Sequence, residues 1–162
     1  MAKNQPRVTL SPMTDEEFGP YLEAGIREYA QQKMISGEWS EQEAVALSEA
    51  DHLRLLPDGL KTLDQHLYTV HDADSGEKVA TIWIALRPKG GRTEAYVYDI
   101  EVHERFRGRG YGRATMLAAI ERAGRMGAQT VGLHVFGHNA TARALYSSLG
   151  FVETNISMSL DL

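Results

Sequence analysis

The chain has 162 residues, 43% of them apolar and 24% charged, with no cysteine and a formal net charge of −5; this predicts one globular domain spanning residues 1–162. The composition excludes a disulfide framework, a thiolate metal site and a cysteine nucleophile, and no apolar run approaches the roughly 20 residues of a membrane span. The first ten residues lack the apolar core of a secretory signal, and the negative charge argues against general nucleic-acid binding, so we expect a cytoplasmic protein with neither membrane nor nucleic acid as partner.

The first half of the chain predicts two helices and a hairpin. Acidic residues directly after Thr14 and aromatic residues at helical spacing predict a helix over residues 14–36. Ser40 and Glu43 form a capping-box pattern for a second helix over 40–56. Two segments rich in β-branched and aromatic residues predict a β-hairpin, followed by a loop rich in glycine and proline; the two strands are 66–71 and 79–86, and the loop is 87–92.

The second half predicts alternating strands and helices. In the order of the chain they are a strand at 94–103, a helix at 112–126, a strand at 130–136, a helix at 139–149 and a last strand at 151–160. The strand period places Tyr96 and Tyr98 on the face of Ile100, opposite Asp99 and Glu101. The helical period places four apolar residues of 112–126 on one face: Ala114, Leu117, Ala118 and Ile120.

The densest signal is segment 107–112, Arg-Gly-Arg-Gly-Tyr-Gly, between the strand at 94–103 and the helix at 112–126. Closely spaced glycines let the backbone approach a ligand, the amides and dipole of a helix N-terminus favour a phosphate, and arginines add charge-assisted donors. A Walker A loop is excluded because no Gly-Lys-Ser/Thr occurs, and a Rossmann fingerprint because the third glycine is misplaced. A glycine-rich turn with solvated arginines is the plain alternative.

Two motifs resemble the GNAT superfamily of acyl-CoA N-acyltransferases. Arg107-x-x-Gly110-x-Gly112 is similar to its [QR]-x-x-G-x-[GA] pyrophosphate motif, and residues 133–151 look like its second half. The resemblance covers residues 96–152, about a third of the chain. It implies the GNAT fold, of the α/β (α+β) class: a mixed, mostly antiparallel central sheet with a V-shaped split between two parallel strands and helices on both faces. The N-terminal part is similar to a bacterial subgroup of uncharacterised small N-acetyltransferases.

The resemblance implies that acetyl-CoA lies in the split between strands 96–102 and 130–136, and it implies no metal. Backbone groups of Ile100 and Val102 would pair with the pantetheine as an added strand pairs with a sheet edge. Amides of the glycine turn would hold the pyrophosphate: Arg107, Gly108, Arg109, Gly110, Tyr111 and Gly112. Asn139 would contact the cofactor, and its plain alternative, which is compatible with that role, is a helix N-cap.

Tyr146 would be the general acid that protonates the departing CoA thiolate; its plain alternative is an aromatic side chain flanking the core. An amine nucleophile must also lose a proton, and three residues near the split are candidate bases: Asp99, Glu101 and His134. We rank His134, whose unperturbed pKa of about 6.5 suits a base, and Asp99 above Glu101. Each of the three has the alternative of a hydrogen-bonded strand residue.

The activity implied by the resemblance is that of an acyl-CoA-dependent N-acyltransferase. It would move an acetyl group from acetyl-CoA directly to a primary amine, of a small molecule or a protein, in a ternary complex. The alternative is a catalytically weak acyl-CoA-binding or regulatory module. Family members are often dimers, so a homodimer is a candidate assembly. Five aromatic residues are candidates to line the acceptor pocket, with packing under the two N-terminal helices as the alternative: His66, Tyr68, Trp83, Tyr96 and Tyr98.

Overall fold

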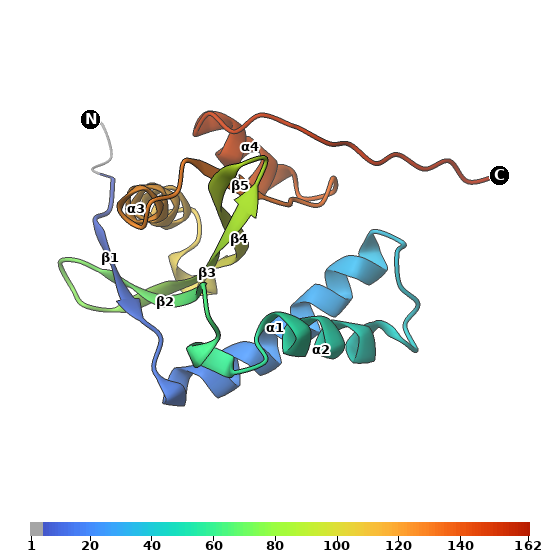
Figure 1. Ribbon diagram of the computed structural model, residues 1–162, viewed down its shortest axis with the longest axis horizontal. Coiled ribbons are helices and arrows are strands. Elements are labelled where there is room, and N and C mark those ends of the chain that lie inside the picture. Colours follow the sequence, from blue (N-terminus) through green and yellow to red (C-terminus); the bar gives the residue numbers. More distant parts are fainter. Residues whose placement is uncertain (1–4) are drawn as a thin grey trace.

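The computed structural model describes residues 5–162 (Figure 1). Its elements in chain order are β1 (Val8–Pro12), α1 (Asp15–Ile35), α2 (Ala44–Leu55), the 3-10 turn η1 (Gly59–Lys61), β2 (Gln65–Asp72), β3 (Lys78–Lys89), β4 (Arg92–Val102), the 3-10 turn η2 (Glu104–Phe106), α3 (Tyr111–Arg125), β5 (Thr130–Leu133) and α4 (Ala140–Ser148). The strands form one sheet in the order β1-β2-β3-β4-β5, antiparallel throughout except for the parallel pair β4–β5.

Helices cover both faces of this sheet. Figure 1 shows α3 on one side, and α1 with α2 on the other. Each face has its own apolar cluster, the larger one under α3 and the smaller one around Trp83 under α1. These layers confirm the predicted mixed, mostly antiparallel sheet with helices on both faces. None of the helices described in residues 5–162 is long and apolar enough to cross a membrane.

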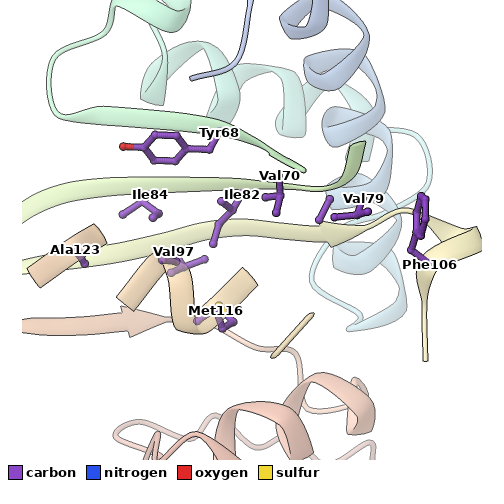
Figure 2. Close-up of a cluster of buried hydrophobic side chains, with 12 residues drawn as sticks. Tyr68, Val70, Val79, Ile82, Ile84, Val97, Phe106, Met116 and Ala123 are labelled. Carbon is purple, nitrogen blue, oxygen red and sulfur yellow. The ribbon is translucent and has the colours of Figure 1, made fainter. Parts of the chain in front are cut away.

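The larger cluster fixes α3 against the sheet. Figure 2 shows Ile82, Ile84 and Val97 of the central strands close to Met116 and Ala123 of α3. The predicted apolar face of this helix is partly wrong, since its buried residues are Ala114, Thr115, Met116, Ala119 and Ala123. Leu117 is 41% exposed. The buried stripe combines three alanines, which let the helix approach the sheet closely, with Met116, which is fully buried.

A capping box fixes the start of α1. The Thr14 amide donates to Glu17 Oε2 at 2.9 Å, and the Glu17 amide donates to Thr14 Oγ1 at 3.3 Å. Glu17 also accepts from Thr69 of β2 at 2.9 Å and forms an ion pair with Lys78 of β3. The hydrogen bond from Lys78, followed by that from the Thr14 backbone, lowers the pKa of Glu17 to about 2. The first turn of α1 is therefore attached to the sheet.

Two predictions in the first half of the chain are corrected, and one strand there was missed. Residues 87–92 are not a loop, because β3 and β4 continue to a tight turn at Gly90 and Gly91, which have φ values of 57° and 76°. Strand β1 was not predicted, since it is short, lies at the sheet edge and ends at Pro12. The second helix begins at Ala44 and not at residue 40, although Ser40 does bond Glu43 at 2.6 Å.

Two predicted strands near the end of the chain also differ. The strand at 130–136 ends at Leu133, so His134 lies just beyond it. No strand occurs over 151–160, although the whole segment is among the described residues. From Ile156 onward the segment alternates apolar and polar residues as a strand does, but it pairs with no strand among the described residues.

The pair β4–β5 holds a buried carboxylate against a glycine. Glu94 is 2% exposed and accepts from Arg87 Nε at 2.9 Å and from Lys89 Nζ at 2.8 Å. A Cβ atom on Gly132 would overlap Glu94 Oε2 and lie 2.8 Å from its Cδ. Gly132 is therefore required by space and not by backbone conformation.

We expect Gly132→Ala to lower the free energy of unfolding by about 1–3 kcal/mol, because Glu94 can yield only by straining its two ion pairs. Gly124→Ala is the matched control, since nothing lies within 4 Å of a Cβ there and alanine raises the stability of a helix interior by roughly 0.5–1 kcal/mol. Urea denaturation followed by tryptophan fluorescence measures both. Equal effects of the two substitutions would show that Glu94 relaxes freely.

Candidate active site

The parallel strands β4 and β5 part before β4 ends. Their pairing runs from Glu94–Thr130 to Val97–Leu133, whereas β4 continues to Val102, paired with β3 alone among the described residues. This is the predicted V-shaped split. Ile100 and Val102 lie on β4 beyond its last pair with β5. The predicted pairing of their backbone groups with pantetheine requires this free edge.

A β-bulge in β4 determines which side chains face α1. Trp83 of β3 pairs with Asp99, but the next residue of β3 pairs with Val97, so Tyr98 is the extra residue. Val97 and Ile100 accordingly pack in the cluster under α3, while Tyr98 packs with Trp83 on the other face. The predicted alternation, with Tyr98 on the face of Ile100, is therefore wrong. The bulge gathers Tyr98 and Asp99 on the side covered by α1.

Asp99 is held there by α1. The Tyr21 hydroxyl donates to Asp99 Oδ2 at 2.8 Å. Burial raises the pKa of Asp99 to about 6, the negative charges of Glu101 and Glu28 add to the rise, and the bond from Tyr21 opposes it. Asp99 is thus a carboxylate that can take up a proton near neutral pH.

Tyr146 of α4 lies within reach of the Asp99 charge. It is partly buried against the larger cluster, with its ring centroid 5.8 Å from that of Phe151. Burial, followed by the charge of Asp99, raises the pKa of Tyr146 to about 12. Its phenol therefore keeps its proton throughout the neutral range, and Asp99 and Tyr146 form a proton acceptor and a proton donor near the opening of the split.

The other two candidate bases are placed differently. Glu101 is exposed, with its Oε1 3.9 Å from Arg107 Nη2. His134 is also exposed and lies edge-on to Phe136, with ring centroids 4.9 Å apart. Among the three candidates in the described structure, Asp99 is the one covered by α1 and the one whose charge acts on Tyr146.

The glycine turn forms the N-terminus of α3 in left-handed backbone conformations. Gly108 has φ of 71°, and Gly110, the N-cap residue, has φ of 90°. The first backbone bond into the helix runs from the Ala114 amide to the Gly110 carbonyl at 3.0 Å. Helix geometry therefore leaves the amides of Tyr111, Gly112 and Arg113 without an intrahelical acceptor. Such a helix N-terminus binds anions, including phosphates.

The side chains of the turn also fix its surroundings. Arg107 Nε donates to the Val102 carbonyl at 2.9 Å, so a backbone group predicted to pair with pantetheine already accepts one bond. The Tyr111 hydroxyl donates to Asp72 Oδ2 at 2.8 Å, which attaches the first turn of α3 to the end of β2. Arg109 is exposed, with its guanidinium carbon 5.9 Å from the Phe106 ring centroid.

Asn139 is the N-cap of α4. Its Oδ1 accepts from the Ala142 amide at 3.1 Å, which is the plain alternative named for this residue. The helix is joined to α3 by Arg113, which donates to Ser148 Oγ at 2.9 Å. The glycine turn and Tyr146 are therefore held on two helices that are attached to each other.

Aromatic rings line the side of the sheet under α1. Trp83 lies 4.8 Å from Tyr98, and Tyr98 lies 4.8 Å from Tyr96, between ring centroids. Two of the five predicted acceptor-side residues are misplaced: Tyr68 is buried in the cluster under α3 (Figure 2), and His66 stacks on it. The sequence pattern of β2 could not show which face Tyr68 and His66 occupy, because both faces of that strand are covered.

Several contacts near the site were missed in the sequence. Tyr21 meets Asp99 across 78 residues, and Gln32 of α1 meets the His138 ring across 106 residues at 2.6 Å. Lys33 Nζ lies 5.4 Å from the Trp39 ring centroid and 5.6 Å from that of Tyr29. No local pattern signals the contacts of Tyr21 and Gln32, because both depend on how α1 crosses the sheet, whereas Lys33 meets rings close to it in the sequence.

The site fits an acyl-CoA on the features of the chain itself. The left-handed glycines, the helix N-terminus and the exposed arginines suit a diphosphate. The edge of β4 beyond Val97, which is paired with β3 on its other side, suits an extended polar chain. Within residues 5–162 no group of three or more histidine, cysteine, aspartate or glutamate residues is arranged to hold a metal ion.

The sequence profile of the acetyltransferase (GNAT) family matches residues 28–151, and the chain belongs to this family. It is 38% identical over 155 residues to YycN of Bacillus subtilis (strain 168), named as an uncharacterised N-acetyltransferase, with 96% of this chain and 99% of YycN covered. A second such protein, YdgE of the same strain, is 34% identical over 154 residues, covering 95% and 98% of the two chains. The crystal structure of YycN matches with a TM-score of 0.91 over 96% of this chain and 98% of that one.

Proposed function

We propose that this GNAT-family chain moves the acetyl group of acetyl-CoA to a primary amine by direct transfer in a ternary complex, within one domain. The observation that carries the proposal is that Asp99, whose pKa of about 6 lets it accept a proton, acts electrostatically on Tyr146, whose pKa of about 12 keeps its phenol protonated at neutral pH. Because the chain has no cysteine, the acetyl group is not passed through a cysteine thioester.

Asp99 is the proposed base. It accepts the proton that the amine loses as the nitrogen bonds to the acetyl carbon. Tyr21 orients the carboxylate through its hydroxyl at 2.8 Å, and α1 limits the access of water to it. Burial supplies the driving force, since it gives the carboxylate a higher proton affinity than that of an exposed aspartate.

Tyr146 is the proposed acid. It donates its phenol proton to the thiolate sulfur as the carbon–sulfur bond breaks, and it regains a proton from solvent or from Asp99 before the next turnover. Expelling a thiolate into a site with little water is otherwise costly. The raised pKa keeps the proton on Tyr146 until that moment.

The donor is proposed to bind along β4 and α3. Amides at the start of α3 and the arginines at positions 107 and 109 hold the pyrophosphate. The edge of β4 that faces away from β3, at Ile100 and Val102, holds the pantetheine. Acetyl-CoA supplies the activated acetyl thioester. The left-handed conformation of Gly110 is needed to present these amides.

A thermal-shift titration with acetyl-CoA, followed by a thiol-release screen over amines, tests the proposal. We expect saturable stabilisation and thiol release with at least one class of amine; the lack of cysteine removes protein background. Gly110→Ala should weaken binding on the order of tenfold, since a left-handed alanine costs roughly 1–2 kcal/mol. Gly90→Ala is the control, because it carries a similar strain in the β3–β4 turn.

The outcomes separate the two function classes. Stabilisation without release over a broad amine panel would indicate the alternative, a catalytically weak acyl-CoA-binding module. No stabilisation at all, or equal binding by both alanine variants, would contradict the role assigned to the glycine turn.

A further inference from the structure

A groove lies between strand β1, at the edge of the sheet, and helix α3. Figure 1 shows these two elements side by side. The groove has a volume of about 210 Å³, and its walls are residues 8–10 of β1 and four residues from one face of α3: Ala118, Glu121, Arg122 and Arg125. Neither Asp99 nor Tyr146 lines it, so the groove is a surface separate from the candidate active site.

The backbone of β1 directs hydrogen-bonding groups out of the sheet. The strand is antiparallel to β2, with which alone it pairs among the described residues. The Ala73 amide donates to the Arg7 carbonyl at 2.9 Å, and in this register every second residue bonds to β2. Val8 and Leu10 therefore point their amides and carbonyls away from β2. An extended peptide is the kind of partner whose own amides and carbonyls match such an edge.

The side chains of the same two residues face α3. Val8 and Leu10 are half-buried at the margin of the larger apolar cluster, and Ala118 lines the groove from the helix. A strand added beside β1 would continue this face of the sheet, with every second side chain over the groove. An apolar side chain at one of these positions would pack beside Val8 and Leu10.

Arg122 gives the groove a positive charge that no carboxylate neutralises. Arg125 forms an ion pair with Glu121, so the charges of those two residues cancel. Arg122 has no ion-pair partner in residues 5–162, and residues 1–4 contain no acidic side chain. Its guanidinium carbon lies 5.2 Å from the ring centroid of the buried Tyr68. The ring holds the guanidinium at the groove and leaves its N–H donors for a carboxylate.

We propose that an extended, acidic peptide segment of a partner protein binds in this groove as a strand added beside β1. Its backbone pairs with Val8 and Leu10. Of its side chains over the groove, one is apolar, and another two positions along carries a carboxylate that pairs with Arg122. A second copy of β1 placed here would supply no carboxylate, because Val8–Pro12 contains none. The inference does not depend on the proposed acetyl transfer.

Amide NMR of the full, isotope-labelled chain tests the proposal with a synthetic peptide. The peptide has blocked ends and the sequence Thr-Leu-Thr-Glu-Thr-Leu-Thr, which places apolar and acidic side chains on one face. We expect saturable changes at the amides of Val8 and Leu10, which should also exchange more slowly with water. The amides of Thr9 and Ser11 already bond to β2 and should change less. No change at Val8 and Leu10 with millimolar peptide would overturn the proposal.

The charge is tested by Arg122→Gln. This variant should bind the peptide about tenfold more weakly, the scale of a hydrogen bond to a charged group. Arg27→Gln is the matched control, since Arg27 is an exposed arginine of α1, and its binding should equal that of the wild type. Binding by Arg122→Gln at the wild-type affinity would contradict the proposed carboxylate contact. Glutarate should not change the Val8 and Leu10 amides; if it does so at the concentration of the peptide, the groove binds a small acid and not a strand.

Strand pairing is tested without altering the protein. Two further peptides carry N-methyl groups at alternate residues, one at the leucines and the glutamate and the other at the threonines between them. An added strand uses the amides of one edge only, so one of these peptides should lose binding and the other should keep it. Equal effects of the two sets of methyl groups would overturn strand addition. A chain with a mass of twice 18.0 kDa and slowly exchanging Val8 and Leu10 amides before any peptide is added would mean that a second copy covers the edge, which also overturns the proposal.

Discussion

Replacing Tyr146 by phenylalanine is expected to lower kcat by about 10²–10⁴, the range that general acid catalysis contributes, while the affinity for acetyl-CoA changes little. The substitution removes one hydroxyl and keeps the ring that packs on Phe151. Loss of an interaction that operates only as the thiolate departs lowers kcat and kcat/KM together. Thiol release measures turnover, and calorimetry measures acetyl-CoA binding.

Tyr68→Phe is the matched control. It makes the same chemical change in a tyrosine that is 5% exposed and lies under α3, on the other face of the sheet from Asp99. We expect it to leave turnover within a small factor of the wild type. Turnover by Tyr146→Phe at the wild-type rate would remove Tyr146 as the acid and would support a role in packing alone.

The fold was predictable because its signals are local. The helix over 14–36 and the hairpin strands at 66–71 and 79–86 follow from side-chain periodicity, and the glycine turn marks the start of α3 by conformational necessity. The errors occur where local signals mislead. Pro88 suggested a loop, yet it lies in a strand pair with Thr93 close to a tight turn.

The site was less predictable because it depends on one irregularity and one long-range contact. Strict alternation in β4 would place Tyr98 with Ile100, and the one-residue bulge reverses that placement. The pKa of Asp99 depends on its burial under α1 and on Tyr21, 78 residues away. Sequence reasoning could name Asp99, Glu101 and His134 as candidates but could not rank them by burial.

The segment at 151–160 shows a third limit. Its apolar alternation from Ile156 onward is that of a strand, but the segment pairs with no strand of the described structure. The period of two shows which residues of an extended segment share a face, but it does not show whether a neighbouring strand is there to pair with them.

Asp99→Asn is expected to remove the ascending limb of the pH–rate profile. A base works only when it is ionised, so wild-type kcat/KM should rise with pH up to about 6 and then level off. The rate should fall again only when Tyr146 loses its proton, at a pH of about 12. This lies above the pH range in which the enzyme can be assayed. Asparagine cannot take up the proton, so the variant should turn over about 10²–10⁴ times more slowly. The ionisation of the amine substrate is common to both enzymes, and the ratio of the two profiles isolates Asp99.

The melting temperature distinguishes loss of the base from unfolding of the variant. Loss of the base alone should leave the melting temperature at pH 7.5 unchanged or higher, whereas an unfolding effect would lower it. The folded-state pKa of Asp99 lies above its ordinary 3.8, so its ionisation opposes folding: the contribution is most favourable below pH 3.8 and is lost as the pH rises through about 6. Asparagine stays neutral and can still accept from Tyr21, so at pH 7.5 the variant should melt no lower than the wild type. Glu101→Gln and His134→Gln serve as comparisons. If either of them removes the limb while Asp99→Asn keeps it, the base is that residue and not Asp99.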